Sequence, residues 1–270
     1  MSLLLCRQEA VTRPYYMETL DIHLHSSQEL CYVIFHHPLL VMDGFIDEGL
    51  VQFVREELNM GALAARLERD IPEGGNQDEL LFLILSECFY YSSQEISQYR
   101  QTVSSLRKKS RPEYAKEKAD YLFQVGQMGK AVKIYESLLE EIQFSGDENF
   151  RGRVWNNLGA AYARMFQTEK AFQAFEQAYG CLKDQNMVKK MYFLTKFNPS
   201  LELSGICRAV AAGEGVKERW DKEAEKAREQ ASQSRDILKL DQLFERDRIK
   251  RSAGTAELVC KWKQDYRSML

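Results

Sequence analysis

The stretch NNLGAAYARMFQTEKAFQAFEQA, residues Asn156–Ala178, decides the fold of this chain. Together with the tryptophan before it, the stretch carries a helical stripe at i, i+3, i+4 and i+7: Trp155, Leu158, Gly159 and Tyr162. A second stripe follows on a helix that Thr168 is positioned to cap: Ala171, Phe175 and Ala178. Gly159 and Ala171 are small where two helices must approach closely, and aromatic rings fill the space beside them. The stretch therefore predicts an antiparallel helical hairpin.

These positions resemble the tetratricopeptide repeat, whose pattern is W-x2-L-G-x2-Y followed by Ala, Phe and Ala at fixed offsets. Every one of those positions matches between about Gly152 and Gln185, and Lys183 stands where the family has its final proline. The resemblance implies a helix-turn-helix unit that stacks on others of its kind.

A degenerate second copy lies upstream. Aligning Ala131 with Ala171 brings four further positions into register: Ala119, Leu122, Tyr135 and Leu138. The two alanines are 40 positions apart, against roughly 34 in a standard repeat. The surplus falls in the stretch 142–152, which predicts a longer second helix or a longer loop in the first hairpin. Residues 185–197 read as the first helix of a third hairpin without the motif.

The predicted fold is all-α, with antiparallel helical hairpins stacked as an α-solenoid and a long helix toward the C-terminus. We expect three regions: divergent helical hairpins over 1–110, repeats over 111–200, and capping or coiled-coil-like helices over 201–270. Few breakers occur in the chain, 15 Gly and 5 Pro, and this favours long helices with short connections.

The region before residue 110 predicts helices and no sheet. Capping signals at Ser26, Asp47 and Ser92 mark three helix starts, and Pro38 ends the first of these helices. The apolar stretch 78–91 predicts a buried helix, and the PEGGN stretch at 72–76 predicts the loop before it. Residues 26–37 also resemble uncharacterised bacterial proteins that carry such repeats, which implies no activity. The role of residues 1–25 stays open.

The polar stretch 213–251 predicts one long helix. Its narrow apolar seam consists of Val216, Trp220, Ala224, Ala227, Ala231 and Leu238. Two interpretations of this helix are open: a capping helix that lies across the last repeat, or a coiled coil that forms a homodimer. Residues 255–270 predict a last amphipathic helix.

The resemblance implies that the first helices of the repeats line a concave groove. At about 100° per residue, one polar side of the residue 153–164 helix lies opposite its core stripe: Arg153, Asn157, Ala160 and Arg164, with Asn156 at the flank. The next helix adds Lys189 and Lys190. Amides on this side can bond to a peptide backbone, and the cations can bind carboxylates. We expect a protein or acidic peptide segment to bind here, the alternative being an ordinary solvated helix surface.

The preceding helix adds Lys116 to the predicted groove. Some family members bind a C-terminal carboxylate with lysine and asparagine at set groove positions, and Lys116 and Asn157 match two of them. Asp120 stands where an asparagine is required, and the third hairpin offers no match. The carboxylate-binding variant of the family is therefore only partly reproduced.

Composition argues against several other classes. The chain has 37 basic and 40 acidic residues, a net charge of −3, whereas nucleic-acid binding favours a basic excess. No apolar run approaches the ~18 residues of a membrane helix, and the three apolar residues before Cys6 fall short of a signal core of about 7–15. We expect a cytoplasmic protein without membrane or nucleic-acid partners, whose six cysteines are buried reduced thiols.

No motif for catalysis, a metal or a cofactor is found. The four histidines lack a completing carboxylate or cysteine at a standard spacing: His23, His25, His36 and His37. The predicted function is a non-catalytic scaffold for a protein or peptide. The alternative is a peptide-responsive transcriptional regulator with a divergent helix-turn-helix, whose opening part would be the stretch 50–70. The stretch 71–89, where the recognition helix would follow, is acidic and then apolar, whereas a recognition helix is polar and basic.

Overall fold

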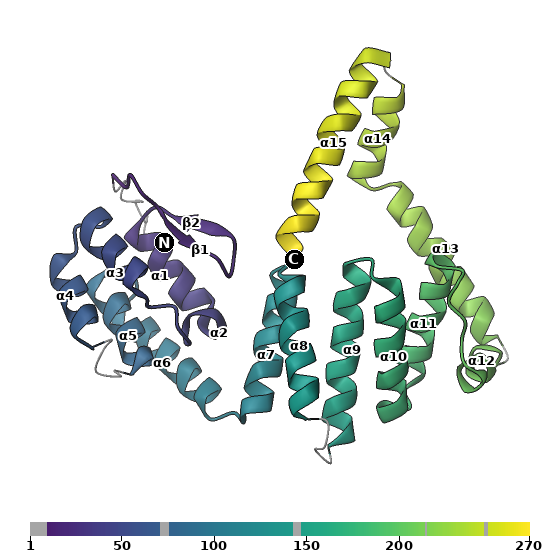
Figure 1. Ribbon diagram of the computed structural model, residues 1–270, viewed down its shortest axis with the longest axis horizontal. Helices are drawn as coiled ribbons and strands as arrows, with labels where there is room; N and C mark the ends of the chain where they lie inside the picture. Colours follow the sequence, from purple (N-terminus) through teal and green to yellow (C-terminus); the bar gives the residue numbers. More distant parts are fainter. Residues whose placement is uncertain (1–9, 71–75, 143–146, 214, 246–247) are drawn as a thin grey trace. The chain divides into compact units, whose positions relative to one another are not determined.

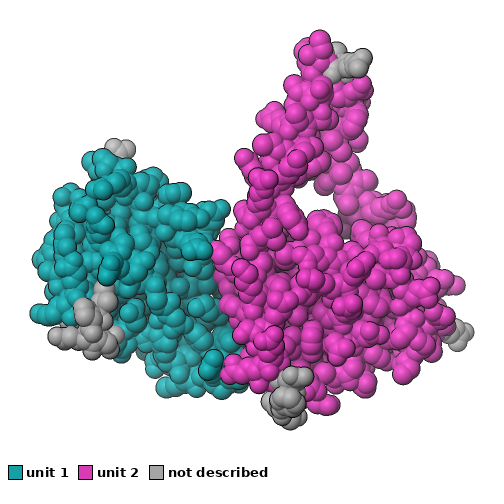
Figure 2. Space-filling view, in the orientation of Figure 1, with its two compact units in different colours: residues 1–121 teal, residues 122–270 magenta. Residues whose placement is uncertain are grey.

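The computed structural model describes residues 10–70, 76–142, 147–213, 215–245 and 248–270 (Figure 1). The chain forms two compact units, a first unit of residues 1–121 and a second unit of residues 122–270 (Figure 2). Within the described residues the structure is helical apart from one small hairpin of strands. The predicted all-α helical-repeat fold is confirmed.

The hairpin of strands corrects the expectation that the first 110 residues hold no sheet. Strands β1 (Tyr15–Met17) and β2 (Ile22–Leu24) pair antiparallel. Asp21 in the turn has a positive φ of 56°, and its carboxylate accepts a hydrogen bond from the Tyr16 hydroxyl at 2.8 Å. Three-residue strands are too short to show a period-two pattern in the sequence.

The first unit contains short helices in close succession. They are α1 (Ser27–His36), α2 (Pro38–Val41), α3 (Glu48–Gln52), the π-helix η1 (Phe53–Glu57), α4 (Gly61–Asp70), α5 (Gln77–Glu87) and α6 (Ser93–Arg107). The predicted helix starts are confirmed, because Ser26, Asp47 and Ser92 each accept a hydrogen bond from a backbone N–H of the following turn. The predicted loop at 72–76 lies outside the described residues except for Asn76, which caps α5.

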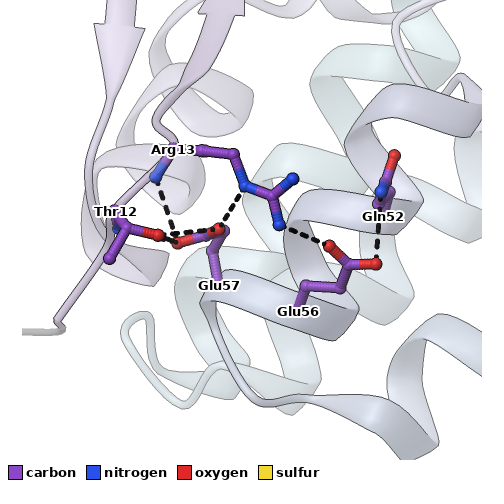
Figure 3. Close-up of polar contacts among 5 residues, drawn as sticks. All are labelled: Thr12, Arg13, Gln52, Glu56 and Glu57. Atoms are coloured by element: carbon purple, nitrogen blue, oxygen red, sulfur yellow. Dashed lines mark hydrogen bonds and ion pairs between the residues drawn. The ribbon is translucent and has the colours of Figure 1, made fainter.

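A buried carboxylate attaches the segment before β1 to η1 (Figure 3). Glu57 is 8% exposed and accepts hydrogen bonds from the backbone N–H groups of Thr12 (2.7 Å) and Arg13 (3.2 Å). The Thr12 hydroxyl and the Arg13 guanidinium donate to the same carboxylate. These donors stabilise the charged form, so the pKa of Glu57 is lowered, first of all by the backbone of Thr12.

The second unit begins within helix α7 (Arg111–Gln124) and contains the predicted repeats except for the part of α7 before residue 122. Its further helices are α8 (Met128–Glu141), α9 (Glu148–Arg164), α10 (Thr168–Leu182), α11 (Gln185–Phe197), α12 (Gly205–Ala211), α13 (Val216–Ser232), α14 (Arg235–Phe244) and α15 (Arg248–Met269). Gly126, at φ +89°, makes the tight turn between α7 and α8.

The hairpin of α9 and α10 packs as the motif predicts. A Cβ atom added at Gly159 would lie 2.8 Å from two ring carbons of Phe175, so the glycine lets the ring approach the helix backbone. Leu158, Tyr162, Ala171 and Ala178 are buried around this contact. One detail was wrong: Gln167, not Thr168, is the N-cap of α10, and the Thr168 hydroxyl instead accepts from Asn198.

The surplus residues between the repeats lengthen the connection and the first turn of α9. Helix α8 has 14 residues, close to the 15 of α10, while α9 has 17. The second helix of the first hairpin is therefore not extended. Residues 143–146 of the connection lie outside the described residues.

The predicted long helix over 213–251 is wrong. It is divided into α13 and α14 by Ser234, whose extended backbone and hydroxyl cap the start of α14. A second division precedes α15, at residues 246–247, which are not described. Helices α14 and α15 contact each other where Leu243, 6% exposed, lies over Gly254. Of the predicted seam, Trp220 is buried and Leu238 is 51% exposed.

Candidate functional site

One side of α9 presents polar side chains to solvent. Arg153 and Arg164 are exposed, and Asn157 and Ala160 between them are partly buried. The other side of the helix is buried in the repeat core through residues such as Leu158 and Tyr162. The polar side of α9, together with Lys189 and Lys190 of α11, is called the α9–α11 face below.

The two arginines of the face lie against aromatic rings. The Arg164 guanidinium is 5.3 Å from the ring centroid of Phe123, and that of Arg153 is 5.9 Å from that of Phe150. Within the described residues neither arginine forms an ion pair with a carboxylate. Stacking on a ring restrains the side chain, while the guanidinium N–H donors stay available for an anion.

A hydrogen bond joins α11 to α9 at the centre of the face. The Lys190 ammonium donates to Asn156 Oδ1 at 2.5 Å, and the Asn156 amide donates to Asn157 Oδ1 at 2.9 Å. The same ammonium lies 5.2 Å from the ring centroid of Phe175. Burial lowers the pKa of Lys190, and the charge of Asp184 only partly opposes this shift. The lysine is thus partly desolvated, and an anion bound beside it would raise its pKa again.

The other lysine of α11 contacts the tail of the protein. Lys189 forms an ion pair with Glu223 on α13. Next to it, Asp221 of α13 accepts from the Tyr192 hydroxyl at 2.7 Å, and Trp220 packs on the Tyr192 ring with centroids 5.5 Å apart. Helix α13 therefore covers this flank of α11.

Lys116, the remaining predicted residue, lies on the part of α7 that belongs to the first unit. Its ammonium forms an ion pair with Asp120 at 2.6 Å, one helical turn away. Asp120, which departs from the carboxylate-binding pattern, thus neutralises the charge of Lys116, which matches that pattern. Lys116 is not part of the α9–α11 face as the structure defines it.

Surface hollows adjoin α9 and α11. A hollow of about 470 Å³ is lined by α11 residues that include Asn186, Lys190 and Phe193. A larger one, of about 1110 Å³, lies on the opposite side of α9, between α8 and α10, and is called the α8–α10 hollow. Its floor includes Trp155, a motif residue that sequence reasoning placed in the core and that is only partly buried.

A comparison with known families identifies the repeat region. The family model described as tetratricopeptide repeat matches residues 113–184, which run from the first turn of α7 to the end of α10. Over this region the chain is similar to tetratricopeptide repeats. No curated protein and no solved structure matches the chain. Tetratricopeptide repeats generally form non-catalytic scaffolds for protein interaction, and this is the functional class that the match supports.

The histidines lie outside the matched repeats, and His36 and His37 both lie near the Tyr32 ring. His37 Nδ1 lies 2.6 Å from the Tyr121 hydroxyl, and the His23 ring lies 4.9 Å from the Tyr16 ring, tilted by 39°. In the part of the chain that the structure describes, no group of three His, Cys, Asp or Glu side chains is arranged to hold a metal ion. Likewise, none of the described helices is both long and apolar enough to cross a bilayer.

The expectation of buried cysteines is confirmed at two of the five described positions and wrong at Cys260, while Cys6 lies outside the described residues. Cys31 and Cys207 are buried, Cys88 and Cys181 are partly buried, and Cys260 on α15 is exposed. Most side chains of α15 are exposed, including that of Cys260. The local sequence does not show how little of this helix is packed.

Proposed function

We propose that this chain is a non-catalytic scaffold whose tetratricopeptide repeats bind an acidic peptide or protein segment across the α9–α11 face. The observation that carries the proposal is the set of three cations there that have no ion-pair partner within the described residues: Arg153, Arg164 and Lys190. Arginine donors that are held by aromatic rings are suited to bidentate binding of carboxylates.

The amides of the face supply the second element of the proposal. Asn156 and Asn157 lie between the cations and already bond to each other and to Lys190. An extended peptide can exchange these contacts for hydrogen bonds to its own backbone, while its acidic side chains reach the arginines. Ala160 leaves room for the peptide to approach the helix, because its side chain is a single methyl group.

The alternative of a transcriptional regulator is not favoured by the contacts of the first unit. In the stretch 50–70, Arg55 pairs with Glu68 and Arg66 pairs with Glu87, so these arginines are not available to phosphates. Helix α5, which follows, is buried along most of its length. A recognition helix instead presents polar and basic side chains to the major groove.

A quantitative pull-down tests the proposal. The immobilised wild-type chain is compared with Arg153→Glu plus Arg164→Glu, and with a matched control, Lys133→Glu plus Lys222→Glu, whose lysines are exposed on α8 and α13. Partners that the wild type and the control retain should be lost from the first variant, since the charge change is equal in both. If every partner remains bound to the Arg153 and Arg164 variant, the assignment of the face is wrong.

A further inference from the structure

Helix α15 exposes an apolar stripe that the described part of the chain covers only partly. Val259, Trp262 and Tyr266 are 43%, 48% and 39% exposed. Their spacing of i, i+3 and i+7 places them within about 60° of one another around the helix. The contact of α15 with α14 is made elsewhere, at Gly254. These three residues are called the α15 stripe.

The helix that carries the stripe is basic. Residues 248–270 contain six basic and two acidic side chains, a net charge of +4, in a chain whose overall charge is −3. Lys263 and Arg267 border the stripe on one side at about 100° per residue, and Glu257 lies on the opposite side of the helix. The stripe therefore combines apolar rings with adjacent cations.

The α8–α10 hollow has the complementary character. It is lined by four glutamates and two cations, a net charge of −2: Glu136, Glu140, Glu148, Glu176, Arg151 and Lys170. Glu148 pairs with Arg151, and Glu136 accepts a hydrogen bond from Tyr162. Among the described residues, Glu140 and Glu176 have no ion-pair partner. The partly exposed Trp155 supplies an aromatic surface between these carboxylates.

We infer that the α15 stripe of one copy of this chain binds in the α8–α10 hollow of a second copy. The rings of Trp262 and Tyr266 pack against Trp155, and Lys263 and Arg267 approach the unpaired carboxylates of the hollow. This contact lies on the opposite side of α9 from the proposed peptide-binding face, and it requires a partner of opposite charge.

The size of the contact sets its strength. Aromatic side chains carry roughly 150–250 Å² of surface, so each of the two rings offers on the order of 100 Å² that the chain itself leaves uncovered. Such an interface falls at the small end of specific protein contacts. We therefore expect association with a dissociation constant on the order of micromolar, weakened by salt because the charges are at the surface.

Sedimentation equilibrium of the full chain tests the inference through two defective variants. The tail variant is Trp262→Ser plus Tyr266→Ser, and the hollow variant is Glu140→Lys plus Glu176→Lys. Each should sediment at the monomer mass of 31.4 kDa at concentrations where the wild type associates. An equimolar mixture of the two should recover a species of twice the monomer mass, since one copy supplies an intact hollow and the other an intact stripe.

Control variants distinguish the specific contact from nonspecific hydrophobic association. Ile249→Ser removes an apolar side chain that is 83% exposed on α15 outside the stripe and should leave association unchanged. Adding Lys263→Glu and Arg267→Glu to the hollow variant restores opposite charges and should recover association. A wild type that stays monomeric up to about 100 times the expected dissociation constant overturns the inference. So does a mixture that remains monomeric. A hollow variant that associates by itself also overturns it, because that result would indicate pairing of tail with tail.

Discussion

The close approach of α9 and α10 gives the most quantitative prediction, through the substitution Gly159→Ala. The added methyl carbon would stand 2.8 Å from two ring carbons of Phe175, and Phe175 is 3% exposed. Ordinary contacts between carbons are near 4 Å. The ring, the helix or both must shift by close to 1 Å.

The magnitude follows from two opposing terms. Overpacking of a core costs about 1–3 kcal/mol, and exchanging glycine for alanine inside a helix gains about 1 kcal/mol. Gly180→Ala on α10 isolates the second term, because a Cβ there meets no atom within 4 Å. The control should stabilise the protein by about 0.5 kcal/mol, since Gly180 lies near the helix end. At the middle of the overpacking range, the two alanine variants should differ by about 1.5 kcal/mol.

Tryptophan fluorescence during urea unfolding measures the difference. All three tryptophans, Trp155, Trp220 and Trp262, lie in the second unit, so the signal follows that unit rather than the first. In a double-mutant cycle, Phe175→Leu should offset about 1 kcal/mol of the Gly159→Ala penalty, because it removes the atoms that the methyl group meets. Equal stabilisation by Gly159→Ala and Gly180→Ala would refute the packing argument.

Three further predictions concern single side chains. The affinity for an acidic peptide should fall as the pH rises through the lowered pKa of Lys190, because this lysine loses its charge at a lower pH than exposed lysines do. In the same titration, Lys190→Arg should retain its affinity to higher pH. Ser92→Ala removes the hydroxyl of a capping box and should cost about 1 kcal/mol in chemical unfolding followed by circular dichroism, with Ser93→Ala as the neighbouring control. Arg107 on α6 binds Asp78, which is 8% exposed, through two hydrogen bonds from its guanidinium. Arg107→Met removes this ion pair and should cost about 2 kcal/mol in the same unfolding assay; unchanged stability would show that the pair does not stabilise the fold.

Local motifs explain which parts of the fold could be predicted. The α9–α10 hairpin followed from Gly159, Tyr162 and Phe175, because their packing depends on residues close in sequence. Caps such as Ser92 were predictable for the same reason. The break at Ser234 was missed because a serine within a polar stretch becomes a cap only when the helix is not held together by tertiary contacts.

The candidate site shows where sequence reasoning ends. The solvent side of α9 followed from helical periodicity, but the ion pair of Lys189 with Glu223 joins residues on different helices and has no local signal. Trp155 occupies the motif position of a core residue, yet its exposure depends on the space between α8 and α10. The 40-residue interval between the two repeats was the one feature of the sequence that pointed to unusual spacing.

The binding of an acidic peptide to the α9–α11 face tests the central claim most directly. A fluorescein-labelled peptide of alternating glutamate and alanine is titrated by fluorescence anisotropy against the wild type, Arg153→Glu plus Arg164→Glu, and the control Lys133→Glu plus Lys222→Glu. The first variant loses two charge-assisted contacts to the peptide, each of about 1.5 kcal/mol. Its dissociation constant should therefore be at least about 100-fold larger than that of the wild type. The control should bind as the wild type does. Equal weakening in both variants, or none in either, would contradict the claim that this face binds the acidic segment.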